Sequence, residues 1–326
     1  MPLTLPHLPA QETSTPSTGS LRGDLPAWQH AATQSPAPIR LLTLWHLCSL
    51  DAPSVAIAWS LGFAWAMGGH LAAWVPAMQV LMVWAVYVCD RLLDARRAMG
   101  AGELHRLRER HFFHWRHRRV LLPLAMGAGC AACGLIFAFM PDAARERNSL
   151  LAAACLAYFA RVHSGGRMRP FLPAIFTKEL LVGVLFTAGC ALPVFGSLWA
   201  LHRASFRPLL CVTAFFALLA WLNCHAIDAW ESGGLGSGPA GGERRSSFSA
   251  VASTACVLAL AGLALAALMT PLPRVAALLA AGGASAAMLA LLDIKRDRLS
   301  PVTLRAAADA ILLTPAVLLA MARMLR

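Results

Sequence analysis

The stretch VWAVYVCDRLLDARR, residues 83–97, decides how the chain is interpreted, because an apolar run ends in two aspartates and arginines follow at once. Asp90 and Asp94 are four residues apart, so a helix would place both carboxylates on one face. A carboxylate at the C-terminal end of a helix is unfavourable, since the helix dipole is already negative there. We therefore expect a cation, rather than the helix dipole, to set the environment of these side chains.

The composition is that of a membrane protein. Of the 326 residues, 58% are hydrophobic and only 13% are charged, whereas about a quarter of the residues in soluble domains are charged. The apolar runs also reach the roughly 20 residues that a helix needs to cross a bilayer. The alternating ten-residue pattern of an outer-membrane barrel is absent. The sequence therefore predicts an all-α polytopic membrane protein.

The apolar runs predict about nine transmembrane helices in one domain, residues 40–326, after a disordered tail of residues 1–39 that is rich in Pro, Ser, Thr and Gln. The stretch PIRLLTLWHLCSLDAP (38–53), which leads into the first predicted span, suits the membrane interface. Two small-residue runs, GAGCAACG (127–134) and AAGGASAA (280–287), are expected to let helices pack closely. The predicted spans are 48–67, 71–93, 119–140, 148–164, 174–196, 207–230, 248–269, 273–293 and 303–323.

The net charge of +12 comes mainly from arginines in short loops between the spans. Membrane topology explains this distribution more simply than nucleic-acid binding does. Nineteen Lys and Arg residues fall on the side that holds the N-terminus and the loops after even-numbered spans, against seven on the other side. We therefore expect a cytoplasmic N-terminus. The abundant Ala, Leu and Arg suit a bacterium with GC-rich DNA, and we expect the chain in its cytoplasmic (inner) membrane.

Acidic residues gather at the predicted cytoplasmic ends of spans 2 and 6. The sixth span ends in WLNCHAIDAWESGG (221–234), where Asp228 and Glu231 share a helical face. Paired carboxylates from two helices can hold Mg²⁺ through oxygen ligands, and the Mg²⁺ can hold a diphosphate. The arginines of LRERHFFHWRHRR (107–119) can bind phosphate oxygens. An apolar cavity beneath such a site would accept an isoprenoid chain.

A simpler interpretation of each feature stays open. Asp90 and Asp94 could pair with Arg91, Arg96 and Arg97 at the water boundary. Asp228 and Glu231 could be ordinary residues at the start of a polar loop, and residues 107–119 could contact lipid headgroups.

The arrangement resembles the UbiA-type intramembrane prenyltransferase superfamily over residues 38–323. Arg40 and Pro53 match its opening segment, and residues 158–189 resemble its passage from span 4 to span 5, where Lys178 precedes a glycine-containing helix. The family carries aspartate-rich motifs on spans 2 and 6. This chain departs from them with Val86 and Tyr87 in place of Asn and Asp.

In the second motif, Asn223 fits the opening Asn and Glu231 the closing acid, while Ile227 stands where an Asp is expected and Asp228 lies one residue further on. The resemblance implies a Mg²⁺-dependent transfer of an isoprenoid chain from a prenyl diphosphate to a hydrophobic acceptor, which could be aromatic, a quinone precursor or a lipid. Asp94 or Asp228 would take up the released proton. The implied Mg²⁺ ligands are Asp90, Asp94, Asp228 and Glu231, and the implied substrate-binding residues are Asn223, Arg91, Arg97, Arg108 and Lys178.

Two other functions remain as alternatives. A catalytically silent relative would bind isoprenoid or quinone-like lipids, and the missing Asn-Asp at positions 86–87 favours it. A transporter is a weaker alternative, because transporters usually place polar sites near the midplane. Arg305 and Asp309 in the last span keep that alternative open, and their i, i+4 spacing predicts that they pair with each other.

Overall fold

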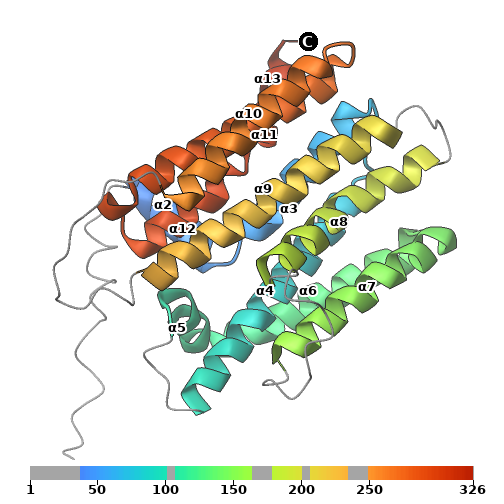
Figure 1. Ribbon diagram of the computed structural model, residues 1–326. Helices are drawn as coiled ribbons and strands as arrows, with labels where there is room; N and C mark the ends of the chain where they lie inside the picture. Colours follow the sequence, from blue (N-terminus) through green and yellow to red (C-terminus); the bar gives the residue numbers. More distant parts are fainter. Residues whose placement is uncertain (1–36, 101–106, 164–177, 200–205, 234–248, 326) are drawn as a thin grey trace, which may run out of the picture.

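The computed structural model describes residues 37–100, 107–163, 178–199, 206–233 and 249–325 (Figure 1). These residues form helices and no strand, which confirms the all-α class. Most of the predicted tail, up to residue 36, lies outside the described residues. The helices are α2 (Ala37–Leu47), α3 (Asp51–Ala66), α4 (Trp74–Gly100), α5 (Glu109–Arg116), α6 (Arg118–Phe139), α7 (Asp142–His163), α8 (Lys178–Trp199), α9 (Phe206–Gly233), α10 (Ala250–Leu268), α11 (Pro273–Ile294), α12 (Pro301–Ile311) and α13 (Thr314–Met324), with a 3₁₀ turn, η3 (Arg296–Arg298), after α11.

Six of the described helices are long and apolar enough to cross a membrane: α4, α6, α8, α9, α10 and α11. Two further spans result if each bent pair counts as one, with α2 and α3 meeting at 92° and α12 and α13 at 45°. The predicted span 148–164 falls on α7, which is not among these helices. Its first two turns carry Asp142, Arg145, Glu146 and Arg147, and the charges lower its hydropathy. The described helices thus give six to eight spans, against the nine predicted.

Helix α4 runs seven residues further than its predicted end at residue 93. Its 27 residues correspond to a length of about 40 Å, whereas the hydrocarbon core of a bilayer is about 30 Å thick. Asp90 and Asp94 therefore lie inside the helix and not in its last turn. The helix dipole acts mainly within that last turn, so the expected conflict between these carboxylates and the dipole is much reduced.

The middle of the bundle is filled with aromatic side chains. Trp59 of α3 stacks on Phe216 of α9 with ring centroids 3.9 Å apart, and Phe63 packs edge-on against Phe216. All three are fully buried. The indole N–H of Trp59 donates to the carbonyl of Leu312 at 2.9 Å, so burial leaves no unsatisfied donor on the ring. This core joins α3 and α9 to the turn between α12 and α13.

Both small-residue runs lie at contacts between helices, and the run in α11 packs more closely. In α11, a Cβ added to Gly283 would come within 3.1 Å of the Ala259 carbonyl oxygen of α10, and one added to Gly282 would meet Phe215. The prediction for residues 280–287 is thus confirmed. In α6, a Cβ on Gly127 or Gly134 would have no atom within 4 Å among the described residues, but one on Gly129 would lie 4.0 Å from the Ala85 Cβ of α4. Ala128 of the same run is buried against α4, so the run in α6 also packs against a neighbouring helix, at an ordinary van der Waals distance.

One end of the bundle collects the polar groups. Figure 1 shows α5 next to the C-terminal end of α9, and α5 also packs against α2 and α4. At the same end, the Trp230 indole of α9 and the Ser249 hydroxyl before α10 both donate to Asp293 near the end of α11. We call this the polar end. It contains the ends of α4, α9 and α11, whose following loops the charge distribution assigns to one side of the membrane.

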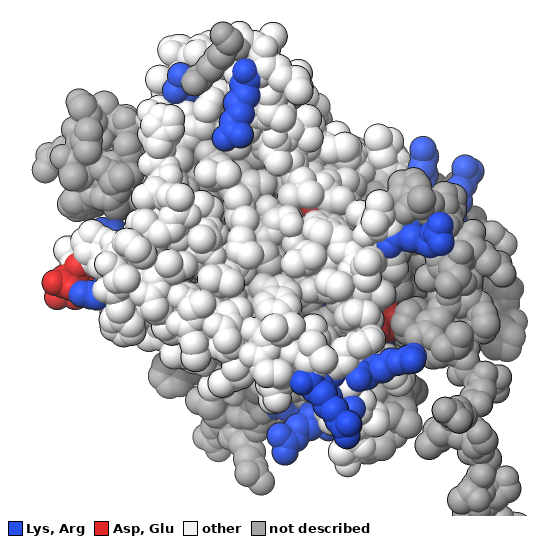
Figure 2. Space-filling view, turned by 180° about the vertical axis from the view of Figure 1, so that it is seen from behind, with Lys and Arg blue, Asp and Glu red and all other residues white. Residues whose placement is uncertain are grey.

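Across the face shown in Figure 2, the middle is wide and has almost no charged atoms at the surface, and the Lys and Arg side chains lie at its margins. This distribution is expected when the apolar middle of a protein contacts lipid and its charged ends contact water. Together with the apolar helices, it indicates an integral membrane protein.

The contact between α10 and α11 leads to a stability prediction. A Cβ on Gly262 would lie 2.9 Å from the Gly283 Cα, so Gly262→Ala should destabilise the protein by about 1–3 kcal/mol through overpacking. Gly134→Ala in α6 is the matched control, because open space surrounds the new methyl group and Ala favours helix over Gly by about 1 kcal/mol. Thermal unfolding in detergent compares the two variants. Equal melting temperatures would contradict the close approach of α10 and α11.

Candidate functional site

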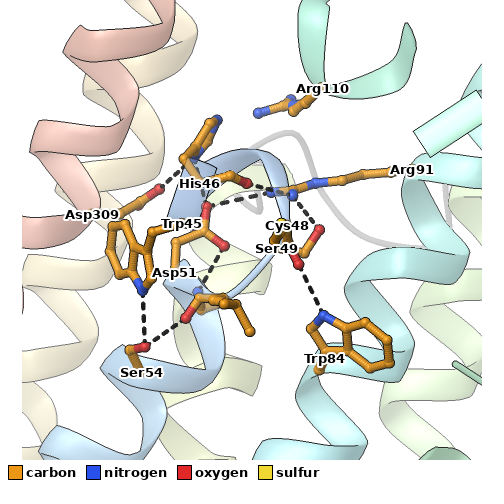
Figure 3. A network of polar contacts seen from close by, with 12 residues as sticks. Trp45, His46, Cys48, Ser49, Asp51, Ser54, Trp84, Arg91, Arg110 and Asp309 are labelled. Carbon is orange, nitrogen blue, oxygen red and sulfur yellow. Dashed lines mark hydrogen bonds and ion pairs between the residues drawn. The ribbon is translucent and has the colours of Figure 1, made fainter. Parts of the chain in front are cut away.

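The polar end contains a network of buried polar side chains that come from distant parts of the sequence (Figure 3). Its centre is the bend between α2 and α3, and side chains from α4, α5, α9 and α12 converge on it. We call this set the elbow network. Its members that are at most 5% exposed are His46, Ser49, Asp51, Arg91, His114, Asn223 and Arg305, and Asp309, Glu231, Arg108 and Arg110 contact or border them.

The bend itself is a helix C-cap built around Ser49. The Ser49 N–H donates to the His46 carbonyl, and the Leu50 N–H donates to the Trp45 carbonyl, as in a Schellman motif. Ser49 has a φ of 59°, a left-handed conformation in which Gly is usual and other residues are strained. Strain of this kind persists where surrounding contacts require it. The contacts of the Ser49 hydroxyl supply that reason.

Arg91 of α4 reaches across to the bend. One guanidinium nitrogen, Nη1, donates to the His46 carbonyl at 3.2 Å and to the Ser49 hydroxyl. The other, Nη2, lies 3.5 Å from Asp51 Oδ2. The Trp84 indole, two turns earlier on α4, donates to the Cys48 carbonyl at 2.9 Å. The last carbonyls of α2 are therefore capped by α4, and the angle between α2 and α3 depends on this helix.

His114 of α5, which lies in the arginine-rich segment 107–119, also contacts the bend. Its Nδ1 lies 2.8 Å from the Arg110 carbonyl, and its Nε2 lies 2.9 Å from the Ser49 hydroxyl. A carbonyl oxygen only accepts hydrogen bonds, so Nδ1 carries the proton and Nε2 accepts from Ser49. Burial lowers the pKa of His114 to about 4, and the charges of Arg91 and Arg110 act in the same direction. His114 is thus neutral at physiological pH.

The same environment acts on the rest of α5. Burial and the neighbouring charges of Arg110 and Arg91 lower the pKa of His111 to about 3. Burial lowers the pKa of Arg110 to about 10, and Arg91 and Arg108 add to the effect. Arg110 therefore keeps its charge at neutral pH, and both histidines are neutral. The segment 107–119, which was expected as a basic loop, is in part a helix packed onto the bundle.

Two aspartates from opposite ends of the chain meet at His46. The His46 Nδ1 lies 2.7 Å from Asp51 Oδ2 and 3.6 Å from Asp309 Oδ2. The Asn223 amide donates to Asp309 Oδ1 at 3.0 Å. The prediction that Arg305 and Asp309 pair with each other is wrong, because the partner of Arg305 is on α9. Their i, i+4 spacing allowed a pair, but tertiary partners compete for both side chains.

Glu231 lies between two arginines. Its Oε2 is 2.5 Å from Arg108 Nη2, and its Oε1 forms an ion pair with Arg305 Nη2. Arg108 immediately precedes α5, and Arg305 belongs to α12, so Glu231 ties three segments together. Both carboxylate oxygens of this residue are already engaged by guanidinium groups.

The structure brings four of the nine residues predicted for the site into the elbow network: Arg91, Arg108, Asn223 and Glu231. Asp90 and Asp94 are half-buried on α4, where their charges and that of Glu179 act on Tyr158. Asp228 is exposed, and its charge acts on Arg108. Lys178 is exposed at the start of α8, and Arg97 donates to the Val162 carbonyl at 3.1 Å.

Sequence reasoning gave no role in the site to His46 and Asp51, and it considered Arg305 and Asp309 only for the transporter alternative, whereas Arg110 belongs to the segment 107–119 that was expected to bind phosphate. A signal for three of them was present, because ionisable residues inside apolar segments are costly and face an interior. Asp51 follows an apolar run, and Arg305 and Asp309 lie within the predicted last span. The sequence does not show that these residues lie close together, because their proximity depends on the packing of α12 against α2.

Comparisons of the chain with models of protein families, with curated proteins and with solved structures found no match.

The bend at Ser49 can be tested with two substitutions. Both Ser49→Gly and Ser49→Ala remove the hydroxyl that Arg91 and His114 contact, so both should destabilise the protein by about 1–3 kcal/mol. Ser49→Ala also keeps a Cβ in the left-handed conformation, so it should be the less stable of the two by about 1 kcal/mol. Thermal unfolding in detergent measures the order. An alanine variant more stable than the glycine variant would argue against the left-handed conformation.

The neutral histidines of α5 predict a loss of stability in acid. His114 has a pKa of about 4 in the folded protein against an ordinary 6.5, so below pH 6.5 the unfolded chain binds a proton that the folded chain does not. Stability should therefore fall by up to about 3 kcal/mol as the pH decreases from 6.5 to about 4.

The measurement is a series of thermal unfolding curves from pH 7.5 to 4.5. His114→Gln should show a shallower pH dependence, whereas His117→Gln, an exposed histidine one residue beyond α5, should keep that of the natural chain. The same slope in all three proteins would rule out His114 as the titrating group.

Proposed function

We propose that this chain is a membrane-embedded prenyltransferase of the UbiA type. It would transfer an isoprenoid chain from a prenyl diphosphate to a hydrophobic acceptor of the aromatic, quinone-precursor or lipid class, with Mg²⁺ as the metal. Its active site would lie at the polar end, which we assign to the cytoplasmic side on the distribution of Lys and Arg.

The observation that carries the proposal is the set of guanidinium groups in the elbow network. Arg305 is 4% exposed, and its Nε has no hydrogen-bond acceptor. The buried Nε of Arg110 also has none. A buried donor without an acceptor costs free energy, so the two atoms favour an additional acceptor. Phosphate oxygens fit, because the planar guanidinium binds them in a bidentate manner.

The charges of the network set a condition on this ligand. Four guanidinium groups, those of Arg91, Arg108, Arg110 and Arg305, lie among three carboxylates, those of Asp51, Asp309 and Glu231. The charges of Glu109 and Asp228 also act on Arg108, and that of Glu109 acts on Arg305. The acids thus balance the arginines, so a diphosphate group would have to bring positive charge with it as Mg²⁺, and its isoprenoid chain would suit the apolar bundle.

The implied metal ligands fit Mg²⁺ in part. Asp90 and Asp94 provide the oxygen ligands that Mg²⁺ prefers, and Mg²⁺ is commonly held by one or two carboxylates together with substrate phosphates. Glu231 fits poorly, since both of its oxygens contact arginines. When bound, the metal would supply positive charge to the diphosphate leaving group.

The residues of the chain would act on the leaving group and on the proton. The C–O bond to the diphosphate breaks and its electron pair stays with the diphosphate, leaving an allylic carbocation. Arg305, Arg110 and Arg91 would stabilise the negative charge that develops on the leaving oxygen. The acceptor then forms the new bond to the carbocation and releases a proton, and Asp94, on the half-buried face of α4, would take it up.

One observation favours a second candidate, a silent relative that binds isoprenoid or quinone-like lipids without reaction. Glu231 pairs with Arg108 and Arg305, and Asp51 pairs with Arg91 and His46. Carboxylates that are occupied in this way can stabilise the fold without any metal. Mg²⁺ dependence of diphosphate binding separates the two candidates, because a silent lipid binder needs no metal.

The test is the thermal stability of the purified chain in detergent with geranylgeranyl diphosphate, with and without Mg²⁺. A ligand that binds only the folded state stabilises it by about 2.7 kcal/mol at a hundred times its dissociation constant. We expect a Mg²⁺-dependent increase in the natural chain and a loss of that increase in Asp90→Ala and Asp228→Ala.

Asp142→Ala is the matched control, since Asp142 begins α7 and pairs with Arg145 away from the elbow network. It should keep the full increase. An increase that is independent of Mg²⁺ would favour the silent relative, and no increase with any donor length would refute diphosphate binding.

A further inference from the structure

His46, Asp51 and Asp309 form a group of potential metal ligands within the elbow network. One nitrogen and two carboxylate oxygens lie within 4.8 Å of one another, and in the described ranges no other three or more His, Cys, Asp or Glu side chains meet in this way. The three come from the end of α2, the start of α3 and the last turn of α12. Figure 3 shows His46 and Asp51 at the bend with Asp309 directed toward them.

The His46 ring nitrogen is the observation that points to a ligand. His46 is 2% exposed, and its Nδ1 has no hydrogen-bond partner. It lies 2.7 Å from Asp51 Oδ2 and 3.6 Å from Asp309 Oδ2, yet neither contact has the alignment of a hydrogen bond. A divalent ion that takes the place of a proton on this buried nitrogen would gain a nitrogen ligand beside two carboxylate oxygens.

The surroundings hold the three ligands in place. The Asn223 amide donates to Asp309 Oδ1, which leaves Oδ2 toward His46. The Ala52 N–H donates to Asp51 Oδ1 at 2.9 Å, and the capped bend fixes His46 relative to Asp51. Hydrogen bonds of this kind orient ligands in metal sites. The buried Oδ1 of Asn223 also has no hydrogen-bond partner.

The neighbouring arginines limit the affinity of His46, Asp51 and Asp309 for a metal ion. Arg91 lies 3.5 Å from Asp51 Oδ2, and the charges of Arg305 and Arg110 interact with Asp309. These cations oppose a metal ion, whereas the two carboxylates offset a divalent charge. Two carboxylates side by side in an apolar bundle repel each other unless a cation or a proton lies between them.

We propose that His46, Asp51 and Asp309 bind one divalent first-row transition-metal ion. An imidazole nitrogen with two carboxylate oxygens suits ions such as Zn²⁺ or Mn²⁺, whereas Mg²⁺ prefers oxygen ligands alone. The proposal does not rest on the prenyltransferase function, because the Mg²⁺ ligands considered there, Asp90, Asp94 and Asp228, are different residues.

The test is equilibrium dialysis of the full chain in detergent, first stripped with a chelator, against Zn²⁺, Mn²⁺ or Mg²⁺ alone. Elemental analysis then gives the metal content. We expect about one Zn²⁺ per chain and an affinity that follows Zn²⁺ > Mn²⁺ > Mg²⁺. Asp309→Asn and His46→Asn should lose the bound Zn²⁺. Asn223→Ala, which removes only the hydrogen bond to Asp309, should weaken binding about 10–100-fold.

Asp293→Asn is the matched control, because Asp293 is a buried aspartate at the polar end that accepts hydrogen bonds from Trp230 and Ser249, outside the proposed ligand group. It should keep the Zn²⁺. Melting curves without metal identify any variant that fails to fold, and Asp51→Asn then replaces it. No Zn²⁺ on the folded natural chain, or Zn²⁺ kept in folded Asp309→Asn, would overturn the proposal. Zn²⁺ lost in Asp90→Asn but kept in His46→Asn would move the site to α4.

Discussion

The contact between the Arg91 guanidinium and the bend after α2 is the interaction on which the polar end depends. Without a cationic donor from α4, the His46 carbonyl and the Ser49 hydroxyl would lose a buried partner, and Asp51 would lose its guanidinium. The bend turns the chain through 92°. That turn places His46 and Asp51 beside each other and opposite Asp309. Arg91 therefore stabilises the bend, offsets the charge of Asp51 and helps to position the candidate ligands His46 and Asp51.

The cost of burying so many charges is met by mutual pairing. An isolated charge in a low-dielectric interior is very unfavourable, and removing one partner of a buried pair leaves the other uncompensated. In the elbow network each carboxylate contacts a cation or a histidine: Asp51 contacts Arg91 and His46, Asp309 contacts His46, and Glu231 contacts Arg108 and Arg305. The neutral state of His114 fits this arrangement, since another positive charge would add to the repulsion among the arginines.

Much of the fold follows from the sequence, whereas the site follows only in part. Long apolar runs with few charges indicate membrane helices regardless of context, and the helical class is confirmed for this reason. The end of α4 was misplaced because the prediction followed hydropathy, whereas the helix continues through the charged residues up to Gly100. Asp90 and Asp94 attract attention because they are neighbours in sequence. Asp51 and Asp309 are 258 positions apart in the chain, and no local pattern connects them.

The length of α4 has a consequence for the membrane in which the chain resides. Asp90 and Asp94 lie about 24 and 30 Å along the helix from Trp74, so in a bilayer with a core of about 30 Å they stand near the hydrocarbon boundary. A thicker bilayer would draw both carboxylates toward the acyl chains unless the helix changed its tilt. Hydrophobic mismatch would thus change the surroundings of this face of α4 directly, and the lipid composition of the host membrane would affect the site itself.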